Sequence, residues 1–258
     1  MKFERAHTSC YTRAVKISIV VPAFNEEQLL GETLAQIKSA ADALAKAGWQ
    51  TELIVCDNNS TDRTADIARA AGATVVFEPV NQIARARNSG AAVATGDWLV
   101  FVDADSHPSA GLFADMAKEI QSGQCIAGGA TIRWDRHFLS EPITPVWNIA
   151  SRWRRWLTGA FIFVETATFR KLGGFSNEAF AGEEMELSWR LKPLAAETGK
   201  RFVILHRHPV VTSARRVGSY SVFRQIRLVG SVIYHVIFNP HRFTASREAA
   251  RLWYDGRR

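Results

Sequence analysis

Short apolar, β-branched segments alternate with helical patterns three times within the first 102 residues of the chain. The predicted strands are residues 17–21, 52–56, 74–77 and 98–102, and the predicted helices are 26–47, 62–71 and 84–94. Strands that are apolar throughout and are separated by helices are typical of a parallel sheet with helices on both faces. A chain of 258 residues fits one large α/β domain with a short appendage.

The pattern becomes less regular after residue 105. The predicted helices are 109–121, 143–157 and 183–196, and the predicted strands are 124–132, 161–164 and 202–205. Pro193 should kink the last helix or end it early, because proline cannot donate the hydrogen bond of a helix interior. The chain is accordingly divided into a polar extension (1–16), a main domain (17–216, with halves 17–106 and 107–216) and a helical, Arg-rich tail (217–258).

Composition excludes several classes of protein. Apolar residues make up 47% of the chain and charged residues 22%, which excludes a disordered protein. The 3 cysteines are far apart and odd in number, which argues against a disulfide framework or a zinc site and favours a reducing compartment. The sequence shows neither a secretory apolar segment nor a run of about 18 apolar residues. We therefore expect a cytoplasmic protein, soluble or peripheral on the inner face of the membrane.

Positive charge is concentrated at the end of the chain. The formal net charge is +7, and from His206 onward ten arginines oppose two acidic residues. This distribution argues against a nucleic-acid binder and favours a tail that faces phosphates or an anionic membrane, or else a solvated Arg-rich helix. Residues 217–238 carry an apolar stripe that could lie on a bilayer or pack on the core. Residues 147–156 combine three Trp with three Arg, which suit either sugar stacking or a membrane interface.

Polar residues cluster directly after three of the predicted strands. These segments are PAFNE (22–26), DNNSTD (57–62) and DAD (103–105). In open α/β sheets, ligands bind beyond the carboxyl ends of the strands, so the three segments should meet at one site. On an extended segment Asp103 and Asp105 project to the same side and could share one hard cation, Mg²⁺ or Mn²⁺. The alternative is a turn in which these carboxylates accept hydrogen bonds from backbone amides.

The first two polar segments also have structural interpretations. Asp57 could read a base or a ribose by hydrogen bonding, or it could belong to an Asx turn beside Ser60 or Thr61. Either of those hydroxyl residues could cap the helix that follows. Asn25 could likewise cap the first helix, where Glu26 would be favoured by the helix dipole.

Two further clusters stand at the starts of predicted helices. Arg85 and Arg87 lie where cations are unfavourable to the helix dipole, which indicates a visiting anion or else a stacked or exposed arginine. Glu183, Glu184 and Glu186 repel one another, which should raise at least one pKa and suits a proton acceptor. The alternative is a capped, solvated helix start. Weaker candidates for phosphate or metal chemistry are His206, His208, Arg215 and Arg216.

The ordered set of motifs is more specific than any member. In order along the chain they are PAFNEE, VCDNNSTD, ARNSG, FVDADS, GGF and GEEMEL, with a weaker motif, TSARR, at 212–216. This set spans residues 17 to about 191 and resembles the inverting family 2 glycosyltransferases of GT-A fold. The resemblance implies a UDP- or GDP-type nucleotide-diphospho-sugar donor, a divalent cation (Mg²⁺ or Mn²⁺), and transfer to an acceptor hydroxyl. The acceptor itself is not identified and could be lipid-linked or a glycan.

The resemblance also implies roles for individual residues, with 17–106 binding the nucleotide sugar and 107–216 the acceptor. The nucleoside would be held by Pro22, Ala23, Asn25, Glu26 and Asp57, and the diphosphate would lie near Arg87 and Arg85. Asp103 would approach the ribose and the metal, and Asp105 would ligate the metal. His208 or His206 would supply a third metal ligand. In the acidic motif Glu183-Glu184, Glu184 would act as general base.

The chain departs from the family pattern at two places. The family's acidic motif is usually Glu-Asp, so Glu184 places its carboxylate one methylene further out. The Gln-x-x-Arg-Trp motif is absent, and Arg215 with Arg216 could hold the diphosphate instead. Two rival functions remain weaker. A sugar-1-phosphate nucleotidylyltransferase should have a Gly-rich basic loop after the first strand, which PAFNEE is not, and a non-catalytic binding protein should have lost the acidic residues.

Overall fold

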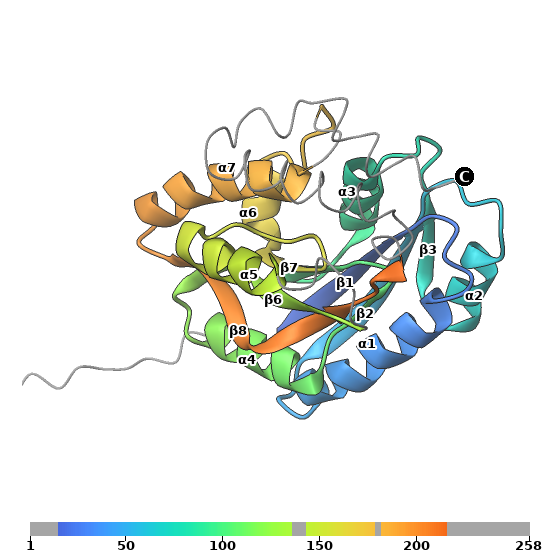
Figure 1. Ribbon diagram of the computed structural model, residues 1–258, viewed down its shortest axis with the longest axis horizontal. Helices are drawn as coiled ribbons and strands as arrows, with labels where there is room; N and C mark the ends of the chain where they lie inside the picture. The colour runs from blue at the N-terminus through green and yellow to red at the C-terminus, as the bar shows by residue number, and fades with distance from the viewer. Residues whose placement is uncertain (1–14, 136–142, 179–181, 216–258) are drawn as a thin grey trace, which may run out of the picture.

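The computed structural model describes residues 15–135, 143–178 and 182–215. The strands are β1 (Lys16–Ala23), β2 (Gln50–Asp57), β3 (Thr74–Phe77), β4 (Trp98–Val102), β5 (Ser106–His107), β6 (Cys125–Trp134), β7 (Phe161–Glu165) and β8 (Arg201–Thr212). The helices are α1 (Leu30–Ala45), α2 (Thr64–Ala70), α3 (Ile83–Val93), α4 (Ala110–Gln121), α5 (Ile143–Arg154), α6 (Thr166–Lys171) and α7 (Glu183–Glu197). The strands of these ranges form one sheet with helices on both sides (Figure 1).

The sheet has two halves of different character. Its strand order is β3-β2-β1-β4-β7-β6-β8-β5. β1 is parallel to β2 and β4, and β2 is parallel to β3, as the alternating pattern predicts. In the second half β7 is antiparallel to both β4 and β6, β5 is antiparallel to β8, and only β6 and β8 are parallel. The α/β fold class is therefore confirmed, with a mixed second half.

Alternate residues of the strands pack into two separate cores. On one face, Val21 of β1 and Val100 of β4 pack with apolar residues of α1, α2 and α4. On the other face, Val20 and Phe101 pack with apolar residues of α3, α6 and α7. Strands that are buried on both faces read as continuous apolar runs, which is why β1 and β4 are recognisable in the sequence.

The structure differs from the predicted elements at three places. α7 continues through Pro193 to Glu197, because Leu194 and Ala195 are buried in the second core and offset the cost of a helical proline. α5 ends at Arg154 rather than at residue 157, since Arg155 has a positive φ of 50°. β8 runs on from residue 205 to Thr212, with a register irregularity between Leu205 and Val210. β5 and α6 were not anticipated.

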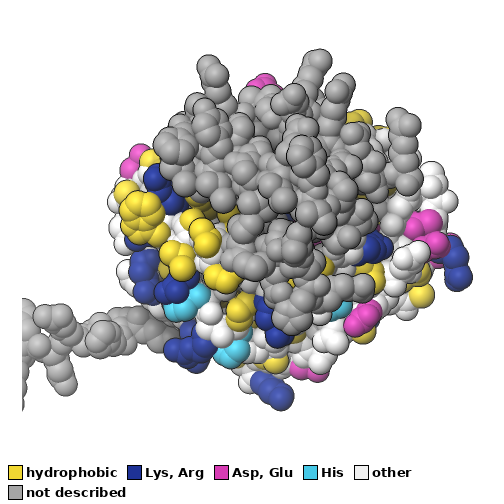
Figure 2. Space-filling model, in the orientation of Figure 1, with side chains coloured by type: hydrophobic (Ala, Val, Ile, Leu, Met, Phe, Trp, Pro, Cys, Tyr) yellow, Lys and Arg dark blue, Asp and Glu magenta, His cyan; other side chains and the backbone are white. Residues whose placement is uncertain are grey.

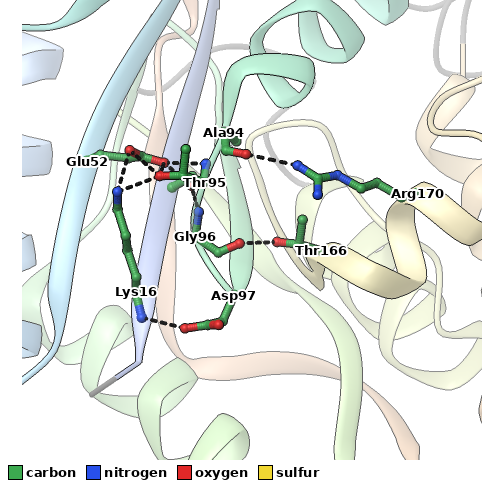
Figure 3. A network of polar contacts seen from close by, with 9 residues as sticks. Lys16, Glu52, Ala94, Thr95, Gly96, Asp97, Thr166 and Arg170 are labelled. Carbon is green, nitrogen blue, oxygen red and sulfur yellow. Dashed lines mark hydrogen bonds and ion pairs between the residues drawn. The ribbon is translucent and has the colours of Figure 1, made fainter. Parts of the chain in front are cut away.

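A polar network holds the amino ends of β1, β2 and β4 together (Figure 3). Glu52 of β2 accepts hydrogen bonds from the hydroxyl of Ser18 and from the amide and hydroxyl of Thr95, and it pairs with Lys16 at 2.8 Å. Burial alone would raise the pKa of Glu52, but these donors outweigh it and lower the pKa to about 2. A Cβ at Gly96 would lie 2.6 Å from the Ser18 hydroxyl, so the loop before β4 requires glycine here.

Several sequence-based predictions fall outside the described residues. These are the polar extension up to residue 14, the Arg-rich tail with its apolar stripe, and Arg216. Among the helices in the described ranges, none is both long enough and apolar enough to cross a membrane.

Candidate active site

The carboxyl ends of β1, β2 and β4 meet at one pocket. Its lining residues are Pro22, Ala23, Phe24, Glu26, Asn58, Ile83, Asp103, Ala104 and Asp105. Asp57 ends β2 directly beside Ala23 of β1 in the sheet register. The three polar segments that follow these strands therefore lie at the same edge of the sheet, as the topology of a parallel sheet requires.

Hydrogen bonds join the turn after β1 to the turn after β2. Asn25, whose φ is +52°, donates its backbone amide to the Ser60 hydroxyl at 3.0 Å. Its side-chain oxygen accepts from the backbone amide of Thr61 at 2.8 Å, and the amide of Glu26 donates to the Thr64 hydroxyl at 2.8 Å. Asn25, Ser60 and Thr61 thus tie two loops together. The prediction that they cap helices is wrong, because α1 begins only at residue 30 and α2 at residue 64.

Asp57 and Asn58 close the end of β2. The buried carboxylate of Asp57 accepts a hydrogen bond from the amide of Ser60 at 3.1 Å, three residues on rather than the two of an Asx turn. The backbone amide of Asn58 donates to the carbonyl of Ala23, and its side chain donates to the carbonyls of Glu78 and Val80. Asn58 contributes to the pocket lining directly, whereas Asp57 lies one residue behind it.

Asp103 and Asp105 lie in a turn, not in an extended segment. The amide of Ser106 donates to the Asp103 carbonyl at 3.0 Å, because the chain reverses there to begin β5 against β8. The alternation argument for this pair is therefore wrong in its geometry, yet both residues line the pocket. The turn is held by the Thr33 hydroxyl, which donates to the Ala104 carbonyl, and by the amide of Ser213, which donates to the Asp105 carbonyl.

Arg87 connects α3 to the end of β4 and to the start of α7. Its side chain is 1% exposed and lies 2.8 Å from the Asp103 carboxylate and 2.6 Å from the Glu183 carboxylate. Burial alone would lower the pKa of Arg87, but the charges of Asp103, Glu183 and Glu184 outweigh it and raise the pKa, so the guanidinium stays charged. The anion expected near this helix start is thus supplied by the protein's own carboxylates. Arg85 instead donates to the side chain of Gln82 at 3.1 Å.

Sequence reasoning missed the residues that shape the space around Arg87. The Phe175 ring centroid lies 5.2 Å from the guanidinium carbon of Arg87. A Cβ at Gly159 would lie 2.6 Å from an Arg87 nitrogen and 3.2 Å from an Asp103 carboxylate oxygen, so a larger residue would displace the Arg87 guanidinium. The side-chain oxygen of Asn88 accepts a hydrogen bond from the backbone amide of Phe175 at 2.9 Å. The motifs ARNSG and GGF contain Asn88 and Phe175, but nothing local in the sequence indicates Gly159.

Glu183 and Glu184 begin α7 after Gly182, whose φ is +72°. Glu183 is buried in its ion pair with Arg87, and Glu184 is half-buried beside it. Burial, and next the charge of Glu183, raise the pKa of Glu184 to about 8, although the charge of Arg87 acts in the opposite direction. The predicted rise in pKa is confirmed, with burial as a larger cause than repulsion. Glu186 forms an ion pair with Arg190 one turn later.

The candidate residues of β8 are not gathered at this pocket. The Nδ1 atom of His208 lies 2.9 Å from the Asp115 carboxylate of α4, while His206 is exposed on β8. Among the residues that the structure describes, no three His, Cys, Asp or Glu side chains are placed to hold one metal ion. His208 therefore does not join Asp103 and Asp105. Arg215, which follows β8, is by contrast at the pocket, because its guanidinium lies 2.6 Å from the carboxylate of the lining residue Glu26.

Comparison with known families agrees with this geometry. Residues 18–172 match the model of the family described as glycosyl transferase family 2. The chain belongs to this family. One family relative, an uncharacterized glycosyltransferase of Mycobacterium tuberculosis, is 31% identical over 143 residues, which cover 54% of this chain and 61% of that protein. The chain thus spans less than two thirds of the length of this relative.

Solved structures of glycosyltransferases share the fold. A mannosyltransferase from Pyrobaculum calidifontis, in complex with GDP-Man and Mn²⁺, has a TM-score of 0.66 at 20% identity and covers 93% of this chain and 70% of that one. Glucosyl-3-phosphoglycerate synthase from Mycobacterium tuberculosis, in complex with Mn²⁺ and UDP, has a TM-score of 0.57 at 19% identity and covers 86% and 78%. These likenesses confirm the GT-A fold for this member of family 2.

Proposed function

We propose that this chain transfers a sugar from a nucleotide-diphospho-sugar to an acceptor hydroxyl with inversion, and that a divalent cation assists. The observation that carries the proposal is the ion-pair bridge from Arg87 to Asp103 and Glu183. This bridge brings the start of α7, with Glu184, to the carboxyl end of β4, where the turn at Asp105 lines the pocket. The buried guanidinium of Arg87 thereby holds the donor-binding edge of the sheet and the carboxylate of Glu184 close together.

The residues present fit a divalent cation. Asp103 and Asp105 offer carboxylate oxygens at one pocket, and Mg²⁺ or Mn²⁺ in such sites commonly uses one or two carboxylates together with water and substrate phosphates. Asp105 would ligate the cation, and Asp103, one oxygen of which binds Arg87, would approach it. When bound, the cation would neutralise negative charge on the departing nucleoside diphosphate. The two neighbours solved with Mn²⁺ support this assignment.

The remaining donor contacts follow from the pocket lining. We assign the nucleoside to the Pro22–Glu26 turn and to Asn58 with Asp57 behind it. Because both terminal nitrogens of Arg87 bind carboxylates, we assign to Arg85 the positive charge near the diphosphate. The neighbours' complexes with GDP-Man and with UDP support a GDP- or UDP-type donor.

Glu184 is the proposed general base. The acceptor oxygen attacks the anomeric carbon from the face opposite the diphosphate, the bond from that carbon to the phosphate oxygen breaks, and the hydroxyl proton passes to Glu184. A carboxylate with a raised pKa is a stronger base than an ordinary one, and its pKa lies nearer the working pH. Glu183 serves in positioning, since its carboxylate is committed to Arg87.

Replacing Glu184 by Gln tests this role. A panel of UDP- and GDP-sugars with Mn²⁺ is first screened for thermal stabilisation, which identifies the donor. With that donor, E184Q should keep the dissociation constant within about twofold while turnover falls by about 10²-fold or more.

The matched control is E197Q, at the exposed far end of the same helix, which should leave both quantities unchanged. Near-normal turnover in E184Q would remove Glu184 as the base. Stabilisation by no nucleotide sugar, with or without Mn²⁺, would contradict the proposed donor class.

A further inference from the structure

Helix α5 exposes an apolar stripe to solvent. Val146, Ile149 and Trp153 are 58%, 66% and 78% exposed, and their spacing places them on one side of the helix. A helix of a globular domain normally turns such a stripe towards the core. Contiguous exposed apolar side chains of this kind mark interaction sites rather than ordinary surface.

Two exposed arginines of the same helix, Arg152 and Arg154, and Arg155 directly after it add positive charge. Within the described ranges none of them forms an ion pair with a carboxylate. Arg154 instead stacks over Trp153 at 4.8 Å and over Trp156 at 5.7 Å. Burial, together with the charges of Arg154 and Arg155, lowers the pKa of Lys192 on α7, which reflects a local excess of positive charge.

A groove between α5 and β8 continues this surface. It is lined on the α5 side by Ile149, Arg152, Trp153 and Arg155, and on the β8 side by Arg201, Phe202, Val203, Ile204 and His206. In Figure 2 hydrophobic side chains lie next to Lys, Arg and His side chains on the left of the face, in the region of α5 and β8. The groove shares no lining residue with the active-site pocket.

We propose that this α5–β8 surface docks on an anionic lipid bilayer. Val146, Ile149 and Trp153 enter the boundary between headgroups and acyl chains, where tryptophan is favoured. The arginines pair with lipid phosphates, which they bind bidentately. A soluble polyanion such as an acidic glycan would satisfy the arginines, but it would leave Val146 and Ile149 in water. The apolar stripe therefore favours a lipid surface.

A short stretch of chain joins this surface to the active site. The chain leaves α5 at Arg154 and reaches Gly159 five residues later. Gly159 packs against the guanidinium of Arg87 and the carboxylate of Asp103. The docking itself does not depend on the proposed transfer reaction.

Vesicle flotation of the full chain tests the proposal. The triple variant V146S/I149S/W153S is compared with F77S/V80S, which removes exposed apolar side chains of another surface. On vesicles containing phosphatidylglycerol, the triple variant should bind at least about tenfold less than the unmodified chain, and F77S/V80S should bind normally. Because both variants keep the Arg-rich tail, equal binding by all three proteins would overturn the proposal.

A second measurement reports insertion directly. In a C10S background, an environment-sensitive fluorophore on I149C should shift to the blue with anionic vesicles, while the same probe on F77C should not. The other two cysteines, Cys56 and Cys125, are buried. Binding of dextran sulfate without binding of vesicles would overturn the proposal in favour of a polyanionic glycan. Unchanged melting temperatures of the variants exclude misfolding as the cause.

Discussion

The two ends of the sheet use buried polar side chains in opposite ways. At the amino ends of the strands, one carboxylate, Glu52, receives hydrogen bonds or ion pairs from Lys16, Ser18 and Thr95 (Figure 3). At the carboxyl ends, the single guanidinium of Arg87 faces three carboxylates, two of which it pairs with directly. The pKa of Glu52 falls to about 2, whereas that of Glu184 rises to about 8.

The ratio of donors to carboxylates accounts for this difference. A carboxylate with a surplus of donors is stabilised in its charged form and ties segments together, which is a structural role. A carboxylate that is buried among other carboxylates keeps its proton until higher pH, which costs stability but suits proton transfer. The same sheet therefore has a stabilising end and a reactive end.

Removal of Arg87 should have the largest effect on this contrast. R87M leaves Asp103 and Glu183 without their shared cation, so the free energy of unfolding should fall by about 3–5 kcal/mol, and turnover should fall with it. Urea unfolding followed by circular dichroism measures the stability. R85M, two residues earlier on α3, should cost less than about 1 kcal/mol. Equal losses of unfolding free energy in R87M and R85M would show that Arg87 does not hold the reactive end together.

Replacing Glu52 by Gln should have a smaller effect, of about 1–3 kcal/mol at pH 7, and should leave turnover unchanged. The folded-state pKa of Glu52 lies below its unfolded value, so its contribution is complete above about pH 4.5 and is lost as the pH falls towards 2. The difference in unfolding free energy between E52Q and the unmodified chain should therefore shrink over this interval.

The exposed pair of Asp66 with Arg69 provides the control for Glu52. D66N should change the free energy of unfolding by no more than about 0.5 kcal/mol at either pH. An E52Q variant as stable as D66N at pH 7 would contradict a stabilising role for the amino-end network.

The sequence predicts the first half of the fold better than the second for a physical reason. β1 to β4 are joined by helices to parallel neighbours, so each element can be read from local periodicity alone. The antiparallel insertion of β7 between β4 and β6, and the pairing of β5 with β8, depend on contacts between distant segments. The passage of α7 through Pro193 likewise depends on tertiary packing, which overrides local propensity.

The candidate site shows the same limit. The topological rule places the segments after β1, β2 and β4 together, because the edge of a parallel sheet is fixed by strand direction. The pairing of Arg87 with Glu183 could not be predicted, since the two residues are 96 apart in sequence. The pairing of His208 with Asp115 on α4 could not be predicted from the sequence either, because it depends on how β8 packs against that helix.

Carboxyl ¹³C titration of Glu52 and Glu184 by nuclear magnetic resonance tests the contrast most directly, with E52Q and E184Q used to assign the signals. We expect Glu52 to titrate near pH 2 and Glu184 near pH 8. A Glu184 signal that titrates near about 4.3, the value of glutamate in model peptides, would contradict the account of a reactive, carboxylate-rich end of the sheet.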